Sequence, residues 1–321
     1  MYMPIRSVLI AMLTTPLLAL SQAYPSKPVR MVVPFPAGGA MDTVARAIGN
    51  RLSEALGQQV VVDNRSGAGG MIGADIVAKA LPDGYTLVLT GGPPHLAYPF
   101  LLKNVPFDTV KDFTPIVVAG TAPQAVVVHP SLPVNSVREL IDYGKKNPGK
   151  LSYGTPGVGS GPHIGGMLLN RAAGIDMVHI GYKGGAPALN DVLGGQIQVG
   201  ILVLSTGMPH VRSGKLRLLG VLDAQRAKAA PEMPTLAEAI PGYAAPDQWI
   251  GIFGPANMPQ AVVNLVNAAV VKAIHLPDVS ARLEAAGFEV KGNTPLEFAD
   301  YVMRAYEYYR KVTAELGIKP E

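Results

Sequence analysis

Short apolar runs alternate with amphipathic stretches of helical length through the first part of the chain. Residues 29–33 form an apolar run, and apolar positions spaced by three and four follow between Val44 and Ala55, as on one face of a helix. A second, buried strand is predicted at 60–62 and a third strand at 85–90, with a helix between them that ends at Lys79. This alternation of strands and helices predicts a mostly parallel sheet.

The middle of the chain breaks this alternation once and then resumes it. Residues 113–128 hold two apolar runs with no helical pattern between them, so we expect this segment to carry the chain into a second lobe. A capping-box sequence at Ser136 and Glu139 then opens a helix. Further strands are predicted at 151–153, 177–180, 199–204 and 216–222, and a strand near 249–253 would return the chain to the first lobe. We expect Trp249 and the tyrosines of the helical tail to pack in the core.

The first residues have the pattern of a secretory signal. Arg6 is the charge of the amino-terminal region, residues 8–20 are apolar, and Ser21 and Ala23 supply the small residues that precede a cleavage site. The apolar run is short for a membrane span, although a retained anchor is the alternative. The chain has no cysteine, which excludes disulfides, thiol catalysis and a lipidated amino-terminal cysteine. We therefore expect a periplasmic, unlipidated protein cleaved near Ala23.

Composition narrows the class of partner. The length of 321 residues suits two domains of ordinary size. Charged residues make up only 16% of the chain, the formal net charge is +4, and no basic run is present. Nucleic acid is therefore not expected as a partner.

Glycine-rich loops follow predicted strands in both halves of the chain. Residues 34–42 join the first strand to the first helix, and Gly38 and Gly39 leave backbone N–H groups without side-chain cover. N–H groups at a helix start have no internal partner and lie at the positive end of the helix dipole, so this loop could seat a carboxylate. The alternative is a structural turn in which Asp42 only caps the helix. Loops at 91–95, 154–163 and 181–187 follow other strands in the same way, and ligands bind at that edge of a parallel sheet.

No catalytic set survives a test of spacing. Ser160 lacks the preceding glycine of a nucleophile elbow because Val158 stands there, and the loop around it lacks a P-loop lysine. Residues 67–73 are one residue off the dinucleotide-binding pattern, which leaves a nucleotide-dependent oxidoreductase as the enzymatic alternative. The six histidines form no metal-binding pair. His163 either donates to a ligand or braces its loop, and Lys183 either faces a ligand or lies on the surface. We expect a binding protein with no catalytic residues, metal or cofactor.

Several motifs resemble one family along essentially the whole mature chain. Together they resemble the Bug-type receptors, the extracytoplasmic solute-binding proteins of tripartite tricarboxylate transporters. The matching segments are Tyr24-Pro-x-Lys-Pro-Val-Arg, Val33-Pro-Phe-Pro-Ala-Gly-Gly-x-x-Asp, Asp63-Asn-Arg-x-Gly-Ala-Gly-Gly, Pro82-Asp-Gly-Tyr-Thr-Leu, Lys111-Asp-Phe-Thr-Pro, Asn147-Pro-Gly-Lys, Tyr182-Lys-Gly-x-Ala-Pro-Ala and Leu193-Gly-Gly-Gln.

The resemblance implies an α/β fold of the type II periplasmic-binding-protein kind, with two lobes, each built on a mostly parallel sheet, joined by two crossover strands. Residues 24–121 and 249–321 would form the first lobe and residues 122–248 the second, with hinges near 119–124 and 245–251. A small carboxylate would be trapped between the lobes for delivery to membrane subunits of a tripartite tricarboxylate transporter, and the protein would be a monomer. A receptor that presents its ligand to a signalling partner is the alternative.

The resemblance also implies a set of ligand-binding residues. Backbone N–H groups of Ala37, Gly38 and Gly39 would hold one carboxylate while Asp42 shapes the helix start. The complete set is Phe35, Ala37, Gly38, Gly39, Asp42, Thr90 and Gly91 from the first lobe and Thr155, Ser160, His163, Tyr182, Lys183, Gly184 and Leu202 from the second.

The chain departs from the family pattern at positions that bear on the ligand. Gln198 and Leu202 replace two acidic residues, and residues 91–94 replace a run of serine and threonine with Gly-Gly-Pro-Pro. A leucine suits neither an amine nor a hydroxyl group of a ligand. We therefore expect a dicarboxylate with an apolar or aromatic middle rather than an amino acid.

Overall fold

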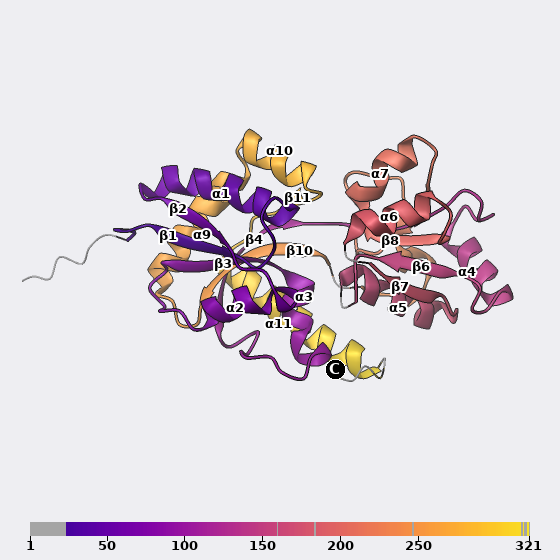
Figure 1. The fold of residues 1–321 in the computed structure, drawn as a ribbon, viewed down its shortest axis with the longest axis horizontal. Helices are drawn as coiled ribbons and strands as arrows, with labels where there is room; N and C mark the ends of the chain where they lie inside the picture. Colours follow the sequence, from indigo (N-terminus) through magenta and orange to yellow (C-terminus); the bar gives the residue numbers. More distant parts are fainter. Residues whose placement is uncertain are drawn as a thin grey trace, which may run out of the picture.

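The computed structural model describes residues 24–158, 160–182, 184–245, 247–315, 317 and 320. The expected signal peptide, residues 1–23, and Lys183 lie outside these residues. Figure 1 shows two lobes side by side, the first at the left and the second at the right. Strand order in the first sheet is β11-β4-β10-β3-β1-β2. Its strands are β1 (Val29–Val33), β2 (Val60–Asn64), β3 (Thr86–Gly91), β4 (Phe113–Thr121), β10 (Trp249–Pro255) and β11 (Glu289–Val290).

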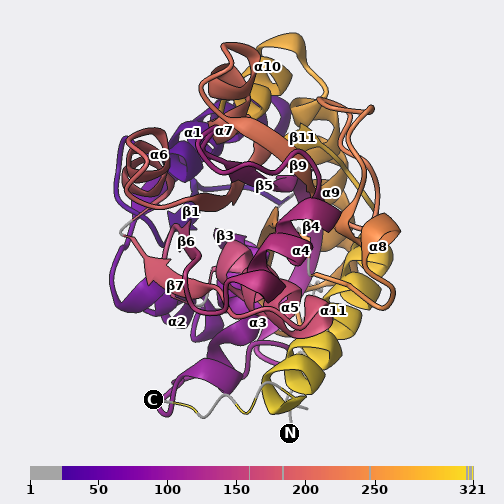
Figure 2. The same cartoon turned by 90° about the vertical axis from the view of Figure 1, so that its right-hand side faces the viewer.

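The second sheet has the strand order β7-β6-β8-β5-β9. Its strands are β5 (Gln124–Val128), β6 (Ser152–Thr155), β7 (Val178–Gly181), β8 (Val199–Val203) and β9 (Arg217–Val221). The chain therefore passes between the sheets twice, from β4 into β5 and from the segment after β9 into β10. Figure 2 shows the second lobe in front, with helices around its sheet. The residue boundaries of the lobes as domains remain a prediction.

Helices cover both sheets. Those of the first lobe are α1 (Ala40–Leu56), the short 3₁₀ helix η1 (Ala68–Gly70), α2 (Met71–Ala78), α3 (Gly92–Leu101), α9 (Gln260–Ile274), α10 (Pro277–Ala285) and α11 (Pro295–Glu315). Those of the second lobe are α4 (Val137–Lys146), α5 (Gly161–Ala173), α6 (Gly185–Leu193), α7 (Leu204–Arg212) and α8 (Leu236–Ala239). In the described part of the chain no single helix is long and apolar enough to cross a membrane, and α9 and α10 reach that length only together, bent by 79°.

Both sheets are mixed, with most strands running one way. In the first, β1, β2, β3 and β4 share one direction, and β10 and β11 oppose them. In the second, β6, β7, β8 and β9 share one direction, and β5 opposes them. The antiparallel pairs arise where the crossover strands enter each sheet. The α/β fold with two lobes is confirmed.

Two local predictions were wrong. β2 is an edge strand and not a buried one, because it pairs only with β1 among the described strands, and Val61 is 43% exposed. The expected loop at 91–95 is the start of α3, which begins at Gly92. Prolines are tolerated there because the N–H groups of a first helical turn have no partner within the helix.

The first sheet has a packed layer on each face. Met31 and Val33 belong to one core with residues of α1 and α9, while Val32 belongs to another with residues of α2, α3 and α11. This two-sided burial follows from the alternation of side chains along a strand that is covered on both faces. Trp249 and Tyr309 are each 1% exposed in the second of these cores, which confirms the prediction that they pack there.

Candidate functional site

The topology brings the glycine-rich loops of the two lobes to facing edges. β4 leaves the first sheet at Thr121, and β5 enters the second at Gln124. Because β1 and β3 run in the direction of β4, their carboxyl ends lie at the edge where the chain crosses. In the second sheet β8 runs antiparallel to β5, and β6 and β7 run parallel to β8. The carboxyl ends of these three strands therefore lie at the edge where β5 begins. The loops after β1, β3, β6 and β7 therefore face one another across the crossovers.

The loop before α1 offers backbone N–H groups, but one of them is already bonded. Residues 36–39 are exposed, and Gly38 has φ +81°, a left-handed conformation that favours glycine. The Gly38 N–H donates to Asp42 Oδ2 at 2.9 Å. In this arrangement the protein's own carboxylate therefore occupies the Gly38 N–H, and its role toward a ligand stays a prediction. Among the described residues, the N–H groups of Ala37 and Gly39 make no hydrogen bond.

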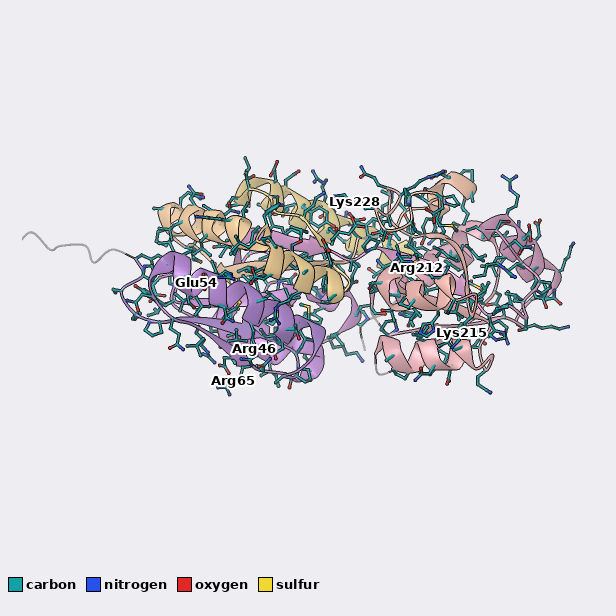
Figure 3. The ribbon with its side chains drawn as sticks, turned by 90° about the horizontal axis from the view of Figure 1, so that it is seen from above. Arg46, Glu54, Arg65, Arg212, Lys215 and Lys228 are labelled. Atoms are coloured by element: carbon teal, nitrogen blue, oxygen red, sulfur yellow. The ribbon has the colours of Figure 1, made fainter. Side chains whose placement is uncertain are left out.

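Side chains from α1 and β2 brace this loop. Asn64 donates to the Phe35 carbonyl at 3.1 Å, and Arg46 donates to Asn64 Oδ1 at 3.1 Å and lies 3.0 Å from Asp42 Oδ1. Burial alone would raise the pKa of Asp42, but hydrogen bonds from Arg46, Gly38 and Asn64 outweigh it and lower the pKa. Asp42 is thus a buried, ionised carboxylate at the start of α1. Figure 3 shows Arg46 and Arg65 on the same side of the first lobe.

Thr90 and Gly91 end β3 next to the second crossover. Thr90 pairs with Gly251 and Gly91 with Ile250 of β10. Both residues are buried, and Gly91 also precedes the first turn of α3. Within the residues that the structure describes, the Thr90 hydroxyl has no hydrogen-bond partner. The pair therefore lies at the facing edge of the first lobe but is covered in this arrangement.

In the second lobe Thr155, Ser160 and His163 lie together at the start of α5. Ser160 caps the helix: its hydroxyl accepts from the His163 N–H at 3.3 Å and donates to the Gly157 carbonyl at 2.7 Å. Thr155 is fully buried, and its Oγ1 lies 2.8 Å from His179 Nε2. A Cβ on Gly161 would lie 2.6 Å from Gln248 Oε1, so this helix start lies directly against the second crossover.

His179 was not singled out from the sequence, where it only formed part of a predicted strand. Its ring stacks on that of His163, with centroids 3.9 Å apart and planes inclined by 27°. Burial and the neighbouring His179 lower the pKa of His163 to about 4, and burial lowers the pKa of His179. Both imidazoles are therefore neutral near pH 7. The sequence did hold one signal for this residue. His179 lies two positions before the end of a strand, and the loop after that strand carries expected site residues.

In the loop before α6, two groups that were expected to bind ligand make hydrogen bonds within the protein. The Tyr182 hydroxyl donates to Asp191 Oδ2 at 2.6 Å, and burial together with this carboxylate raises the tyrosine pKa to about 12. The Gly184 N–H donates to the Pro156 carbonyl at 2.9 Å, and φ of +119° explains the glycine there. These groups hold the loops after β6 and β7 together.

Leu202 is covered in this arrangement, and its expected role in ligand binding stays a prediction. It is 1% exposed and packs in a core with Ala125 and Ala188. Gln198 lies at the other end of β8, where its Oε1 accepts from the Ser152 N–H at 3.2 Å. In this arrangement Leu202 is therefore covered, and Gln198 is engaged by Ser152.

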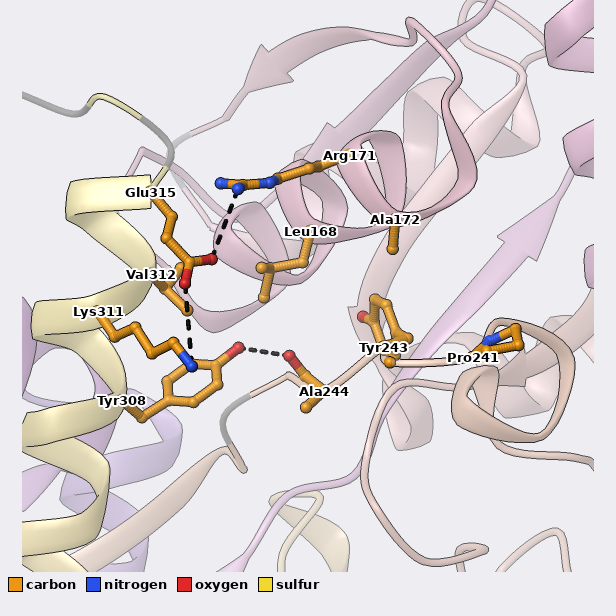
Figure 4. Close-up of a pocket in the computed structure, with 11 residues that line it drawn as sticks. Leu168, Arg171, Ala172, Pro241, Tyr243, Ala244, Tyr308, Lys311, Val312 and Glu315 are labelled. Carbon is orange, nitrogen blue, oxygen red and sulfur yellow. Dashed lines mark hydrogen bonds and ion pairs between the residues drawn. The ribbon is translucent and has the colours of Figure 1, made fainter.

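Two cavities lie between the lobes on other faces. One, of about 500 Å³, lies between α5 and α11 and is bordered by the Arg171–Glu315 ion pair at 3.6 Å and by the hydrogen bond from Tyr308 to Ala244 (Figure 4). The other, of about 490 Å³, is lined by residues that include Ser205 and Phe288. None of the expected ligand residues lines either cavity.

The described part of the chain has no cluster of side chains suited to bind a metal ion. No group of three or more histidine, aspartate or glutamate residues there could hold a metal ion. The candidate site consists instead of helix starts, hydroxyl groups and neutral imidazoles, which suit hydrogen bonding to an anion.

Comparison with known proteins gives one consistent picture. Residues 44–317 match the family model described as the tripartite tricarboxylate transporter family receptor. The chain is similar to the R. palustris protein Rpa4515 solved with adipate (34% identity, 93% of this chain and 100% of that chain, TM-score 0.79). It is also similar to the periplasmic binding protein BugD (33% identity, 93% and 100%, TM-score 0.76). A third similar structure is MatC from Rhodopseudomonas palustris with bound malate (31% identity, 90% and 100%, TM-score 0.75).

Proposed function

Because the chain belongs to the tripartite tricarboxylate transporter receptor family, we propose that it captures a small dicarboxylate between its lobes and delivers it to membrane subunits of such a transporter. The family assignment expected from the sequence motifs is confirmed. The chain is a periplasmic solute-binding receptor of this family, whose structural neighbours are solute-binding proteins and not enzymes.

One observation carries the ligand class: unbonded N–H groups lie in the exposed loop before α1, at the edge of the first sheet where the chain crosses. Ala37 and Gly39 supply these groups, and the dipole of α1 adds positive potential there. A carboxylate at this position would satisfy donors that have no partner among the described residues. The starts of α5 and α6 face the same space and would receive the second carboxylate.

Similar proteins support a diacid. The titles of two structural neighbours name adipate and malate, which are both dicarboxylates. We keep a diacid with an apolar or aromatic middle as the proposed ligand, supported by the lack of hydroxyl side chains at 91–94 and by the adipate of one neighbour. Leu202 gives this choice no support, since it lies in the core.

Capture requires the lobes to close about the crossovers. The Ala122 N–H donates to the Gln248 carbonyl at 2.6 Å, which ties the two crossovers together. Segments 119–124 and 245–251 would absorb the change in backbone angles as a paired hinge. Binding energy then comes from contacts made in the closed arrangement and absent in the open one.

A thermal-shift panel tests the proposal. The exported protein would be purified, unfolded and refolded to remove bound ligand, and heated with succinate, malate, adipate and phthalate. Hexanoate serves as the matched control with one carboxylate. A ligand at one hundred times its dissociation constant adds about 2.7 kcal/mol to the free energy of unfolding. No shift with any carboxylate would overturn the receptor function, and a best response to malate would overturn the apolar middle.

A further inference from the structure

One histidine contacts two residues of the candidate site from a third element. His179 lies in β7, opposite Tyr153 in the register with β6. Its Nε2 lies 2.8 Å from Thr155 Oγ1 at the end of β6, and its ring stacks on His163 in the first turn of α5. The side chain therefore joins β6, β7 and α5 at the edge that faces the first lobe.

The contact with His179 fixes a hydroxyl that would otherwise rotate. A threonine hydroxyl carries one proton and two lone pairs, and its proton turns toward the best available partner. The other contacts of Thr155 Oγ1, with the Gly157 carbonyl oxygen and the Gly157 N–H nitrogen, are both long at 3.4 Å. His179 Nε2 is the short partner and so determines how Thr155 orients toward the loop before α5.

The stacked ring fixes His163 in the same way. Tyr153 lies on the other neighbouring position, with its ring centroid 5.0 Å from that of His179. Tyr153 is 1% exposed, so His179 is held against the core of the second lobe. A ring anchored to this core gives His163 a rigid support at the helix start.

We propose that His179 is a positioning residue for the second-lobe half of the ligand site, orienting Thr155 through its hydrogen bond and His163 through ring stacking. This inference rests on the proposed function. His179 acts through its two neighbours and need not touch the ligand. Its effect on ligand affinity should therefore depend on the presence of Thr155 and His163, and a double-mutant cycle can measure that dependence.

Two substitutions at this position separate its roles. His179→Phe keeps a ring to stack on His163 but removes the nitrogen that contacts Thr155, whereas His179→Gln keeps a hydrogen-bonding group. His129→Phe is the matched control, since His129 also bonds a hydroxyl, that of Ser131, at 2.7 Å but is half-buried and directly follows β5, away from the crossover end of that strand.

The experiment measures the dissociation constants of succinate, malate, adipate and phthalate by calorimetry, with the melting temperature of each ligand-free variant. We expect His179→Phe to weaken the best diacid about tenfold, which corresponds to about 1.4 kcal/mol. His179→Gln should recover part of that loss, because it keeps a hydrogen-bonding group for Thr155 but not the ring that stacks on His163, and His129→Phe should bind like the parent protein. In a background of Thr155→Val, His179→Phe should add little further loss.

The outcomes distinguish the inference from the function beneath it. If the unmodified protein binds none of the diacids, the proposed function fails and the inference fails with it. If the unmodified protein binds a diacid and His179→Phe binds it equally well, only the inference is overturned. The inference is also overturned if the double variant loses affinity by the full product of the two single-variant factors, Thr155→Val and His179→Phe. Such independent effects mean that His179 does not act through Thr155. If a His179 variant melts at a lower temperature but binds the diacid with an unchanged dissociation constant, His179 supports only the fold. That result also overturns the inference.

Discussion

The Gly38 N–H donates a hydrogen bond of 2.9 Å to the Asp42 carboxylate, so the protein's own anion occupies one donor of the loop proposed to hold the ligand. Arg46, one helical turn further on, lies 3.0 Å from the same carboxylate. The arginine balances a charge that would otherwise repel a ligand carboxylate. The local geometry thus combines an anion-binding loop with a buried anion and its counter-ion.

Replacing that counter-ion should weaken ligand binding. Arg46→Met leaves the Asp42 charge uncompensated beside the N–H groups of Ala37 and Gly39, and we expect roughly tenfold weaker binding of diacids. The loss should shrink at high salt because Arg46 is half exposed and salt screens such charges. Calorimetry at two salt concentrations measures both effects. Arg51→Met, on the same helix as Arg46, is the control; it breaks ion pairs with Glu54 and with Asp278 of α10. Equal affinity of the two variants would contradict the prediction.

Leu202 should affect stability and not ligand choice. Leu202→Asn places an amide in a core where the leucine is 1% exposed, and we expect a loss of about 3 kcal/mol in the free energy of unfolding. Leu81→Asn makes the same chemical change at a site 74% exposed and should cost little. Urea denaturation compares the two. A stable Leu202→Asn variant with a new preference for hydroxylated diacids would contradict this prediction and support a role of Leu202 in the site.

A half-buried acid beside the crossovers should make stability depend on pH. Burial and the carboxylates of Asp247 and Glu289 raise the pKa of Asp223 from 3.8 to about 7, against a hydrogen bond from the Gln124 N–H. The folded protein therefore holds this proton more tightly than the unfolded chain, so the free energy of unfolding falls as pH rises from about 4 to 7. The total loss in the free energy of unfolding is at most about 4 kcal/mol, and it is complete above pH 7.

Asp223→Asn removes this titration. Relative to the parent protein, the variant should gain stability at pH 8 and lose that advantage at pH 4. Denaturation curves at the two values measure the difference. Asp142→Asn, at an exposed site on α4, should show no such change. A pH dependence unaltered by Asp223→Asn would rule out the assignment.

The start of α3 depends on the absence of a side chain. A Cβ on Gly92 would lie 1.8 Å from Trp249 Cε2, so Gly92→Ala must displace the indole or the helix. We expect a loss of roughly 3 kcal/mol in the free energy of unfolding. Since Trp249 is the chain's one tryptophan, its emission should shift to the red in the folded variant. Gly194→Ala, where the nearest atom would be 3.4 Å away, is the control and should leave both readings unchanged.

Much of the architecture was predictable because it depends on local patterns. The apolar runs at 115–119 and 125–128, with no helical pattern between them, predicted a passage between lobes, and β4 and β5 contain these runs. The edge position of β2 was not predictable from its three valines, since burial of a strand depends on what lies beside it. The helical start at Gly92 was missed because its glycine and prolines are typical of a loop and equally acceptable in a first helical turn.

For the site, the sequence by itself determined which loops face the other lobe, because parallel strands bring their carboxyl ends to one edge. Only the tertiary structure decided which groups in those loops are already bonded: the Gly38 N–H to Asp42 and the Tyr182 hydroxyl to Asp191. It also decided that Leu202 faces a core and that His179 meets Thr155 and His163. The physical reason is that hydrogen bonds and stacking depend on distances between residues far apart in the chain, whereas the strands and helices depend on neighbours three or four positions away.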